Sequence, residues 1–440
     1  MTITDDMQRA IELIETTRDP IYITGKAGTG KTTLLKYIVS TIKKRFVVTA
    51  PTGVAAINAG GVTLHSLLHI PFGVLSKETN LGGLPREKAT LINKIDAIII
   101  DEVSMVSPDI IDFIDRKLRA YRVCDKPFGG LQLIMFGDLY QLPPVVKVEE
   151  EKILAKFYKG HYFFYANIFK EIGFHVIQLN TVFRQSDPAF VKILNDIRSY
   201  QFTQEDMEEL AERRSKGDSD RFDTGAIHIC THKKTAQDIN NSLLGEATHT
   251  FNAVLEKKFS EKAAPCDLVL NLRVGARVMM LTNNANVGYH NGSLGEVVGF
   301  TDKGVQVALD NGIEIEVEQH KWEASEYVVE GNKITQRVIG SCTQFPLTLA
   351  WAITIHKSQG LTFDNVIIHN KRVFCPGQIY VALSRCTSLE GIILDSFVTK
   401  RQVIPDYDLI AFEAALKATD DQFTTETYNL ITNENNKSQD

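Results

Sequence analysis

Several features that would indicate other classes of protein are missing from this sequence. No uninterrupted apolar run reaches the roughly 18 residues that a membrane-spanning helix needs. The first residues, MTITDDMQRA, lack the basic-then-apolar pattern of a secretory signal. The six cysteines include no CxxC pair, so neither a disulfide framework nor a zinc ribbon is indicated. We therefore expect a cytoplasmic protein, nucleoid-associated if bacterial, with reduced thiols and no membrane partner.

A strongly basic charge balance is also absent. The formal net charge of -6 argues against a wholly basic surface that coats nucleic acid, but it allows a narrow local groove that contacts phosphates. With 440 residues and 44% hydrophobic content, the chain is long and apolar enough for two main domains with insertions. Composition alone leaves the partner open.

Short β-rich apolar runs alternate with longer helical stretches in both halves of the chain. This alternation predicts an α/β fold with two domains, each a parallel sheet wrapped by helices. The expected strands are 21–24, 46–50, 97–101, 133–138 and 175–179 in the first half, and 226–230, 366–370 and 391–395 in the second.

Two stretches differ in composition and pattern from the rest of the chain, and we interpret them as insertions. One is loop-like and rich in Pro and Gly, and the other has short alternating strands with Asn-Gly turns, which predict a small antiparallel β-barrel. The expected parts are a first domain at 1–60 and 96–183 with the loop-like insertion at 61–95, a second domain at 184–293 and 344–420 with the barrel at 294–343, and a frayed polar tail at 421–440.

The segment GKAGTGKT matches the Walker A pattern, and it lies after a predicted strand and before an apolar-periodic helix. Its glycines let backbone N–H groups close around phosphates at a helix N-terminus, while Lys31 reaches the β- and γ-phosphates and the Thr32 hydroxyl ligates Mg²⁺. A chance Gly-rich turn would lack both flanking elements. The expected nucleotide contacts are Gly25, Ala27, Gly28, Thr29, Gly30, Lys31, Thr32 and Thr33.

The predicted strand at 97–101 delivers Asp101 and Glu102 to its carboxyl end, where ligands bind in open α/β sheets. Asp101 would hold Mg²⁺ and Glu102 would activate the attacking water. An acidic pair after a strand is otherwise a solvated turn, but downstream of a Walker A segment we prefer the catalytic interpretation.

Three further residues are candidates for contacts to the γ-phosphate. Gln141, in LIMFGDLYQLPPV, could report the presence of this phosphate, although this stretch taken alone is better explained as a proline-rich loop that packs a strand end. Arg184 in LNTVFRQSD and Arg385 in YVALSRCTS are candidate arginine fingers that stabilise developing charge. Sequence spacing does not place either arginine opposite the Walker segment.

The motifs form an ordered set that resembles superfamily 1 helicases of the RecD-like, Pif-type branch (superfamily 1B). The stretches GKAGTGKT, TAPTGVAA with TLHSL, IIIDEVSM, MFGDLYQLPPV, LNTVFRQ, ITIHKSQGLTFD and YVALSRCTS span residues 25–391. The stretch at 109–138, with its PFGG turn, looks like the part peculiar to Pif-type enzymes. Almost nothing lies outside the motor core, so a compact bacterial or mobile-element type is expected.

The resemblance implies two RecA-like domains and an ATP- and Mg²⁺-dependent DNA helicase that travels 5′ to 3′. It places Gln8 near the adenine, and lets Gln141, Arg184, Gly360 and Arg385 complete the pocket across the domain cleft. Single-stranded DNA and forked or tailed duplexes are the implied partners, with G-quadruplex DNA as a further one. Roles in replication, recombination, repair or telomere-like maintenance follow, and we expect a monomer in solution.

Residues near the nucleotide motifs are candidates for contacts to the tracked strand. Hydroxyls, backbone amides and a few cations suit phosphate contacts that are made and released without reading sequence. For lone Thr and Ser residues the alternative is capping, and for a histidine it is a structural hydrogen bond. The candidates are Pro51, Thr52, Thr63 and His65 in the first domain and Thr354, His356, Lys357 and Ser358 in the second.

Phe72, in the loop-like insertion, is either a stacking wedge that splits the duplex or a packing anchor. Asn291 and Gly292 resemble a family DNA-contact loop, but an ordinary Asn-Gly hairpin turn would look the same. His228, Cys230 and His232 share a strand face without a fourth ligand nearby, so we do not expect zinc. Two alternatives to a helicase stay open: a translocase or motor subunit of a recombination complex that does not unwind, and a nucleotide-dependent switch.

Overall fold

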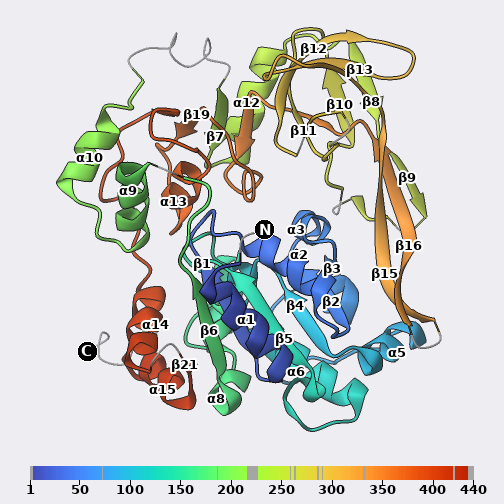
Figure 1. Cartoon of the computed structure of the whole chain (residues 1–440), viewed down its shortest axis with the longest axis vertical. Helices are drawn as coiled ribbons and strands as arrows, with labels where there is room; N and C mark the ends of the chain where they lie inside the picture. The colour runs from blue at the N-terminus through green and yellow to red at the C-terminus, as the bar shows by residue number, and fades with distance from the viewer. Residues whose placement is uncertain are drawn as a thin grey trace. The chain divides into compact units, whose positions relative to one another are not determined.

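A computed structural model describes residues 3–434, except 72, 186, 216–225, 258, 262–263, 285–286, 290, 331–332 and 420–421. The chain divides into two compact units (Figure 1). Unit 1 comprises residues 1–183, 325–337 and 406–440, and unit 2 comprises residues 184–324 and 338–405.

Unit 1 is built on a seven-stranded sheet with the order β21-β6-β1-β5-β4-β2-β3. All neighbouring strands run parallel except β21, which pairs antiparallel with β6. The strands are β1 (Ile21–Gly25), β2 (Phe46–Ala50), β3 (Val62–Thr63), β4 (Ala97–Ile100), β5 (Gln132–Gly137), β6 (Phe174–Leu179) and β21 (Gln422–Phe423). The helices are α1 (Asp5–Thr16), α2 (Lys31–Thr41), α3 (Gly53–Ala59), α4 (Leu64–Leu68), α5 (Arg86–Lys94), α6 (Pro108–Arg122), α7 (Val148–Leu154), α8 (Ile168–Ile172), α14 (Tyr407–Ala418) and α15 (Thr425–Glu434).

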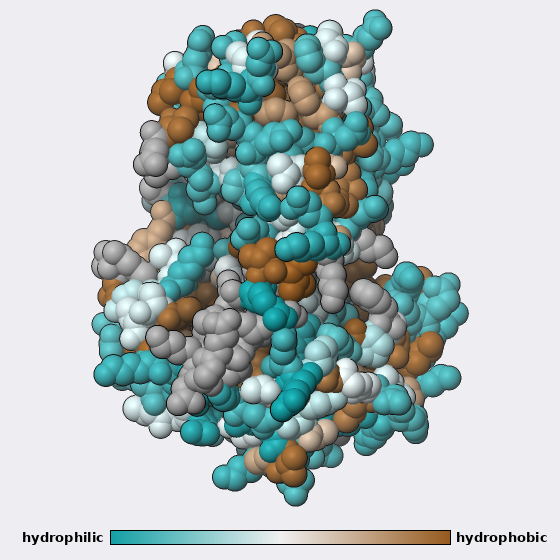
Figure 2. All heavy atoms as spheres, turned by 90° about the vertical axis from the view of Figure 1, so that its right-hand side faces the viewer, coloured by the Kyte–Doolittle hydropathy of each residue, from teal (hydrophilic) through white to brown (hydrophobic). Residues whose placement is uncertain are grey.

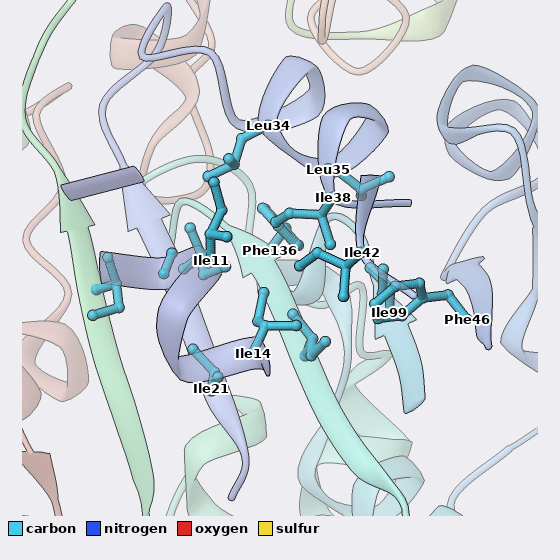
Figure 3. Packing of buried hydrophobic residues seen from close by; sticks show 14 of the residues in the cluster. Ile11, Ile14, Ile21, Leu34, Leu35, Ile38, Ile42, Phe46, Ile99 and Phe136 are labelled. Carbon is cyan, nitrogen blue, oxygen red and sulfur yellow. The ribbon is translucent and has the colours of Figure 1, made fainter. Parts of the chain in front are cut away.

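The core of unit 1 forms where α1 and α2 cover one face of this sheet (Figure 3). Helix α1 buries Met7, Ala10, Ile11 and Ile14, a spacing that places them on one helical face. Strand β4 is buried on both faces, as a central parallel strand should be. The five strands expected in the first half are therefore confirmed, to within one residue at each end.

Unit 2 contains a four-stranded parallel sheet with the order β18-β7-β19-β20. The three strands expected in the second half correspond to β7, β19 and β20, and β18 follows the small β insertion. The strands are β7 (Ile227–Cys230), β18 (Ala352–Thr354), β19 (Val366–His369) and β20 (Ile392–Leu394). The helices are α9 (Pro188–Arg198), α10 (Gln204–Ala211), α12 (Lys233–Leu244) and α13 (Gln378–Leu383).

The small β insertion is larger than the stretch 294–343 that the sequence suggested. Its five-stranded antiparallel sheet, β14-β13-β12-β11-β17, recruits β11 and β17 from outside those bounds, and both pack into the same apolar core. A two-stranded and a three-stranded sheet complete it. The strands are β8 (His249–Asn252), β9 (Val254–Lys257), β10 (Val269–Leu272), β11 (Arg277–Met280), β12 (Leu294–Phe300), β13 (Val305–Leu309), β14 (Glu314–Val317), β15 (His320–Glu330), β16 (Lys333–Gln344) and β17 (Leu347–Leu349).

The expectation that residues 61–95 are loop-like is wrong at both ends of the stretch. Strand β3 pairs with β2 at the edge of the sheet, and α4 buries Leu64, Leu67 and Leu68. At the other end α5 buries Leu91 and Ile92. Apolar anchoring of these two ends outweighs the turn signals of the Pro and Gly residues between them.

The C-terminal residues belong to unit 1, which corrects two assignments made from the sequence. Residues 406–420 were expected in the second domain, but Tyr162 donates a hydrogen bond to Asp406 (2.7 Å) and Tyr165 donates one to Asp408 (2.9 Å). The tail was expected to be frayed, but β21 extends the sheet and the ring of Phe423 stacks on that of Phe174. These contacts are too distant in sequence for local patterns to reveal.

The surface of the protein is mainly hydrophilic on the face shown in Figure 2, and hydrophobic residues there form small separate groups. Among the described residues, no helix combines the length and the apolar character that a membrane crossing requires.

Candidate functional site

The Walker segment forms the loop between β1 and α2 in unit 1. Gly28 and Gly30 adopt positive φ angles of 83° and 81°, which favour glycine and turn the backbone tightly. Helix α2 starts after Gly30, so no side chain caps its N-terminus. The Lys31 ammonium donates to the carbonyl oxygens of Gly25 (2.7 Å) and Lys26 (3.1 Å). The loop and the helix start thus form the cradle that a phosphate group requires.

The other predicted nucleotide contacts lie around this loop. Thr29 is fully buried and its hydroxyl donates to the Lys26 carbonyl (3.0 Å), so it shapes the loop. Thr32 and Thr33 are exposed in the first turn of α2. Gln8 is exposed on α1, and its side-chain amide donates to Glu12 (3.1 Å).

Asp101 and Glu102 follow β4, which is separated from β1 only by β5. The carboxyl ends of these parallel strands lie at one edge of the sheet, so the acidic pair is on the same edge as the Walker loop. Burial of Asp101 and the adjacent Glu102 raise the pKa of the Asp101 carboxyl to about 7, while Lys31 partly opposes this shift. Glu102 has a φ of 53°, an uncommon backbone conformation for a non-glycine residue.

Gln141 is buried after β5, and its side-chain amide lies 3.5 Å from Asp138. Asp138 also accepts a hydrogen bond from the Tyr140 amide (3.2 Å). The segment Gly137–Gln141 is therefore fixed at the same sheet edge, as the sequence predicted for a strand end.

One residue near the loop was missed from the sequence. The amide of Phe183 donates to the Gly28 carbonyl (2.9 Å), and its half-exposed ring lies against the position where a Gly30 side chain would be. Phe183 directly precedes Arg184 in the LNTVFRQ motif, so its position could have suggested a role. A single exposed aromatic residue, however, produces no periodic pattern from which a contact can be predicted.

The two candidate arginine fingers lie close together in unit 2. Arg184 donates to the Ser384 carbonyl (3.2 Å), and burial lowers the pKa of its guanidinium. Arg385 is almost completely buried and donates to the carbonyl oxygens of Val381 (2.9 Å) and Ser358 (3.3 Å). The sequence did not predict this network, which fixes Arg385 within unit 2 in this conformation. Gly360 lies in the adjoining turn with a φ of 78°.

The candidate strand contacts of unit 1 have structural roles in the described state. Thr52 caps α3 by accepting from the Ala55 amide (3.2 Å), and Thr63 caps α4 by accepting from the Ser66 amide (3.1 Å). Pro51 precedes the first cap, and burial lowers the pKa of His65 in α4. Phe72 lies outside the described residues. Thr52 and Thr63 lie at the N-termini of two helices that follow β2 and β3. Because helix N-termini attract phosphates, these capping roles are compatible with contacts to DNA.

In unit 2, the segment Thr354–Ser358 begins at the last residue of β18. Thr354 accepts from the Lys357 amide (3.2 Å), and the buried Ser358 hydroxyl donates to the Ile355 carbonyl (2.8 Å). His356 and Lys357 are exposed, and the Lys357 ammonium lies 3.9 Å from Asp267. Its exposure and charge make Lys357 the stronger candidate for a strand contact in this segment.

The turn before β12 holds the remaining two candidates. The Asn291 amide donates to the side chain of Asn283 (2.7 Å), and the Gly292 amide donates to the Met280 carbonyl (2.9 Å). Gly292 has a φ of 95°, which explains the glycine by backbone geometry alone.

Helix α6 holds the insertion between β3 and β4 by side-chain hydrogen bonds to its backbone. The residues that do so are distributed from the first turn of the helix to the last. Asp109 accepts from Leu75 N (2.8 Å), Arg116 donates to Ser76 O (2.8 Å) and Lys77 O (2.7 Å), Lys117 donates to Leu81 O (2.5 Å), Tyr121 donates to Gly82 O (3.0 Å) and accepts from Leu84 N (2.7 Å), and Arg122 donates to Ile92 O (2.5 Å).

The PFGG turn is held by the same helix. Asp115 of α6 accepts a hydrogen bond from the Phe128 amide (2.6 Å), and Arg122 donates to the Gly129 carbonyl (2.7 Å). The stretch 109–138 thus links the insertion to the sheet of unit 1.

These features define a P-loop nucleotide site on a parallel α/β sheet, joined to a second α/β unit. A profile of the PIF1-like helicase family matches residues 3–207. The chain is 30% identical to an ATP-dependent DNA helicase Pif1 of Bdellovibrio bacteriovorus, and the match covers 93% of this chain and 91% of that protein. The chain therefore belongs to the PIF1-like helicase family, as the motifs predicted.

Longer relatives and solved structures agree with this membership. The mouse ATP-dependent DNA helicase PIF1 is 36% identical over 85% of this chain, which spans only 57% of the mouse protein. A crystal structure of Bacteroides sp. Pif1 with ADP-AlF4 is 51% identical, with a TM-score of 0.91 and coverage of 96% of this chain and 99% of that one. A crystal structure of Bacteroides Pif1 bound to single-stranded DNA is also 51% identical and matches with a TM-score of 0.73. The predicted fold class is confirmed.

Proposed function

We propose that this protein is an ATP-dependent DNA helicase that moves 5′ to 3′ on single-stranded DNA and unwinds duplexes. The observation that carries the proposal is the Walker loop with Asp101 and Glu102 on the same sheet edge, in a chain of the PIF1-like helicase family. The relatives are named as ATP-dependent DNA helicases, and Bacteroides Pif1 binds single-stranded DNA in one structure.

The first step of the mechanism is binding of ATP at the start of α2. Lys31 would exchange its carbonyl partners for the β- and γ-phosphates, and the backbone of Gly25–Thr33 would surround them. Gln8 would contact the adenine. Phe183, beside the loop, offers an exposed ring against which the nucleotide could pack.

The residues at the sheet edge fit a bound Mg²⁺. The Thr32 hydroxyl and the Asp101 carboxylate are hard oxygen donors. Burial and the neighbouring Glu102 raise the pKa of Asp101, and a bound dication would favour its charged form. Bound Mg²⁺ would neutralise charge on the phosphates. Glu102 would take the proton of the attacking water, because its carboxylate is next to Asp101 on the same edge.

Arg184 and Arg385 would donate to the γ-phosphoryl group as its charge develops, while Gln141 and Gly360 complete the pocket. In the described state Arg385 bonds to backbone carbonyls of its own unit. Its finger role therefore requires that the side chain leave part of this network during turnover.

We assign strand tracking to residues at helix and strand ends in both units, and duplex splitting to the insertion held by α6. Phe72 stays a proposed wedge. The strand contacts that we propose are Pro51, Thr52, Thr63, His65, Asn291, Gly292, Thr354, His356, Lys357 and Ser358. Forked and tailed duplexes, and G-quadruplex DNA, are the proposed substrates of a monomeric enzyme that serves replication, recombination or repair.

Unwinding of matched duplexes with a 5′ or a 3′ single-stranded tail tests the proposal. We expect ATP-dependent strand separation of the 5′-tailed duplex only. Separation of the 3′-tailed duplex would reverse the assigned direction. ATP hydrolysis without separation of either duplex would indicate a translocase instead.

A further inference from the structure

Two thiols of the small β insertion lie in contact. Cys266 precedes β10 and Cys342 lies in β16, 76 positions apart, yet their Sγ atoms are 3.6 Å from one another. All six cysteines are free, and no other thiol–thiol contact occurs among the described residues. A disulfide requires an Sγ–Sγ distance of about 2.05 Å, so a displacement of about 1.5 Å would join them.

The surrounding hydrogen bonds keep the two thiols together. Gln344, two residues after Cys342, donates to the backbone carbonyl of Asp267 (3.4 Å), and Thr348 donates to the Asp267 carboxylate (2.7 Å). Asp267 directly follows Cys266. Both chain segments are thus fixed next to their cysteines, and Cys342 packs with Phe259 and Trp322 in a small apolar cluster.

We propose that Cys266 and Cys342 are an oxidisable pair that a low-molecular-weight disulfide, such as oxidised glutathione, converts into an intramolecular disulfide. Cys266 is half-buried and Cys342 fully buried, so Cys266 reacts first. The Cys266 thiolate attacks one sulfur of oxidised glutathione and breaks its S–S bond. This forms a mixed disulfide between Cys266 and one glutathione and releases the other glutathione. The Cys342 thiolate then attacks Sγ of Cys266 and displaces the second glutathione.

The net reaction oxidises two protein thiols and reduces one oxidised glutathione to two glutathione molecules, which take up the two thiol protons. Burial raises the pKa of both thiols, so little thiolate exists at neutral pH. Formation of the disulfide is therefore slow near pH 7 and accelerates as the pH rises.

The disulfide also affects the proposed strand contact at Lys357, a consequence that rests on the proposed function. The Asp267 carboxylate lies 3.9 Å from the Lys357 ammonium, and both side chains are partly exposed. A bond from Cys266 to β16 restricts the neighbouring Asp267 and keeps its carboxylate near Lys357, where it competes with DNA phosphates. Exposed ion pairs are weak, so we expect affinity for oligo-dT to fall about two- to five-fold on oxidation.

Peptide mapping of the intact chain after treatment with oxidised glutathione at pH 8.5 tests the chemistry. We expect a cross-linked peptide pair that contains Cys266 and Cys342, and its loss on reduction. In Cys342→Ser, the reaction of Cys266 should stop at the mixed disulfide with glutathione. Cys266→Ser, which replaces the less buried thiol, should form no cross-link. Absence of the Cys266–Cys342 cross-link from the unmodified chain overturns the proposal.

Oligo-dT affinity of the reduced and oxidised chains tests the coupling. The loss should disappear in Asp267→Asn, which keeps an oxygen for Thr348 but removes the charge beside Lys357. A disulfide with unchanged affinity refutes the coupling alone. Failure of the reduced chain to bind oligo-dT refutes the proposed function, while the peptide mapping still decides whether the pair oxidises.

Discussion

Replacement of Tyr121 by Phe should separate unwinding from ATP hydrolysis. The hydroxyl of Tyr121 donates to the Gly82 carbonyl (3.0 Å) and accepts from the Leu84 amide (2.7 Å), so it holds the middle of the insertion on α6. The substitution removes these two hydrogen bonds and leaves the ring. A hydrogen bond contributes a net of about 0.5–1.5 kcal/mol, and less where the site is partly exposed. Loss of the two bonds therefore lowers the local stability of the insertion by about 1–2 kcal/mol.

A loss of this size raises the local opening of residues 81–84 about 5- to 30-fold, which hydrogen–deuterium exchange can measure. Separation of a 5′-tailed fork should fall because the opened segment is held less firmly on α6, whereas oligo-dT-stimulated hydrolysis stays near normal because no phosphate contact changes. Tyr158→Phe is the matched control. Tyr158 is also partly buried and donates to Asp112 of the same helix (3.0 Å), a carboxylate that accepts from Asn167 and Ile168 rather than from the insertion. Equal loss of both activities in Tyr121→Phe, or equal loss of unwinding in the control, would refute the reasoning.

Three further predictions concern the nucleotide site and stability. Lys31→Ala should abolish hydrolysis, whereas Glu102→Gln should keep ATP binding and slow turnover at least ~100-fold, since only the second change spares the phosphate cradle; equal loss of ATP binding in a fluorescent-nucleotide titration would contradict the roles. Arg184→Ala and Arg385→Ala should lower kcat far more than nucleotide affinity, and Arg385→Ala should also lower the melting temperature because its buried network is lost; near-normal strand-stimulated turnover would remove that arginine from the site. Arg45 lowers the pKa of Asp96 below its ordinary 3.8, so this pair stabilises the fold fully above that pH and progressively less as the pH falls through the depressed value; Arg45→Met should be less stable than the unmodified chain at pH 7 in urea unfolding, and a difference that persists unchanged at pH 2 would exclude this cause.

The strands and the Walker loop were predictable because their signals are local. The run at 97–100 is apolar at consecutive positions, as a strand buried on both faces must be, and the acidic pair directly follows it. The glycines of the Walker loop indicate where the backbone turns tightly. Such features need no knowledge of what lies across the fold.

The remaining features depend on partners that are distant in sequence. Strand β21 has only two residues, and it exists because Phe423 meets Phe174 at the sheet edge. The Asn-Gly turns indicated a barrel, but not that β11 and β17 join its sheet. The polar residues of α6 resemble those of a solvated helix, because the insertion that they bind is distant in sequence.

The central claim is that the Walker site of unit 1 and the strand contacts belong to one motor. Steady-state ATP hydrolysis with and without oligo-dT, on the unmodified chain and on Lys357→Ala, tests it most directly. We expect that oligo-dT accelerates hydrolysis by the unmodified chain, and that Lys357→Ala needs more oligo-dT for half-maximal acceleration while keeping its basal rate. A rate that does not respond to oligo-dT would contradict it and favour a nucleotide-dependent switch.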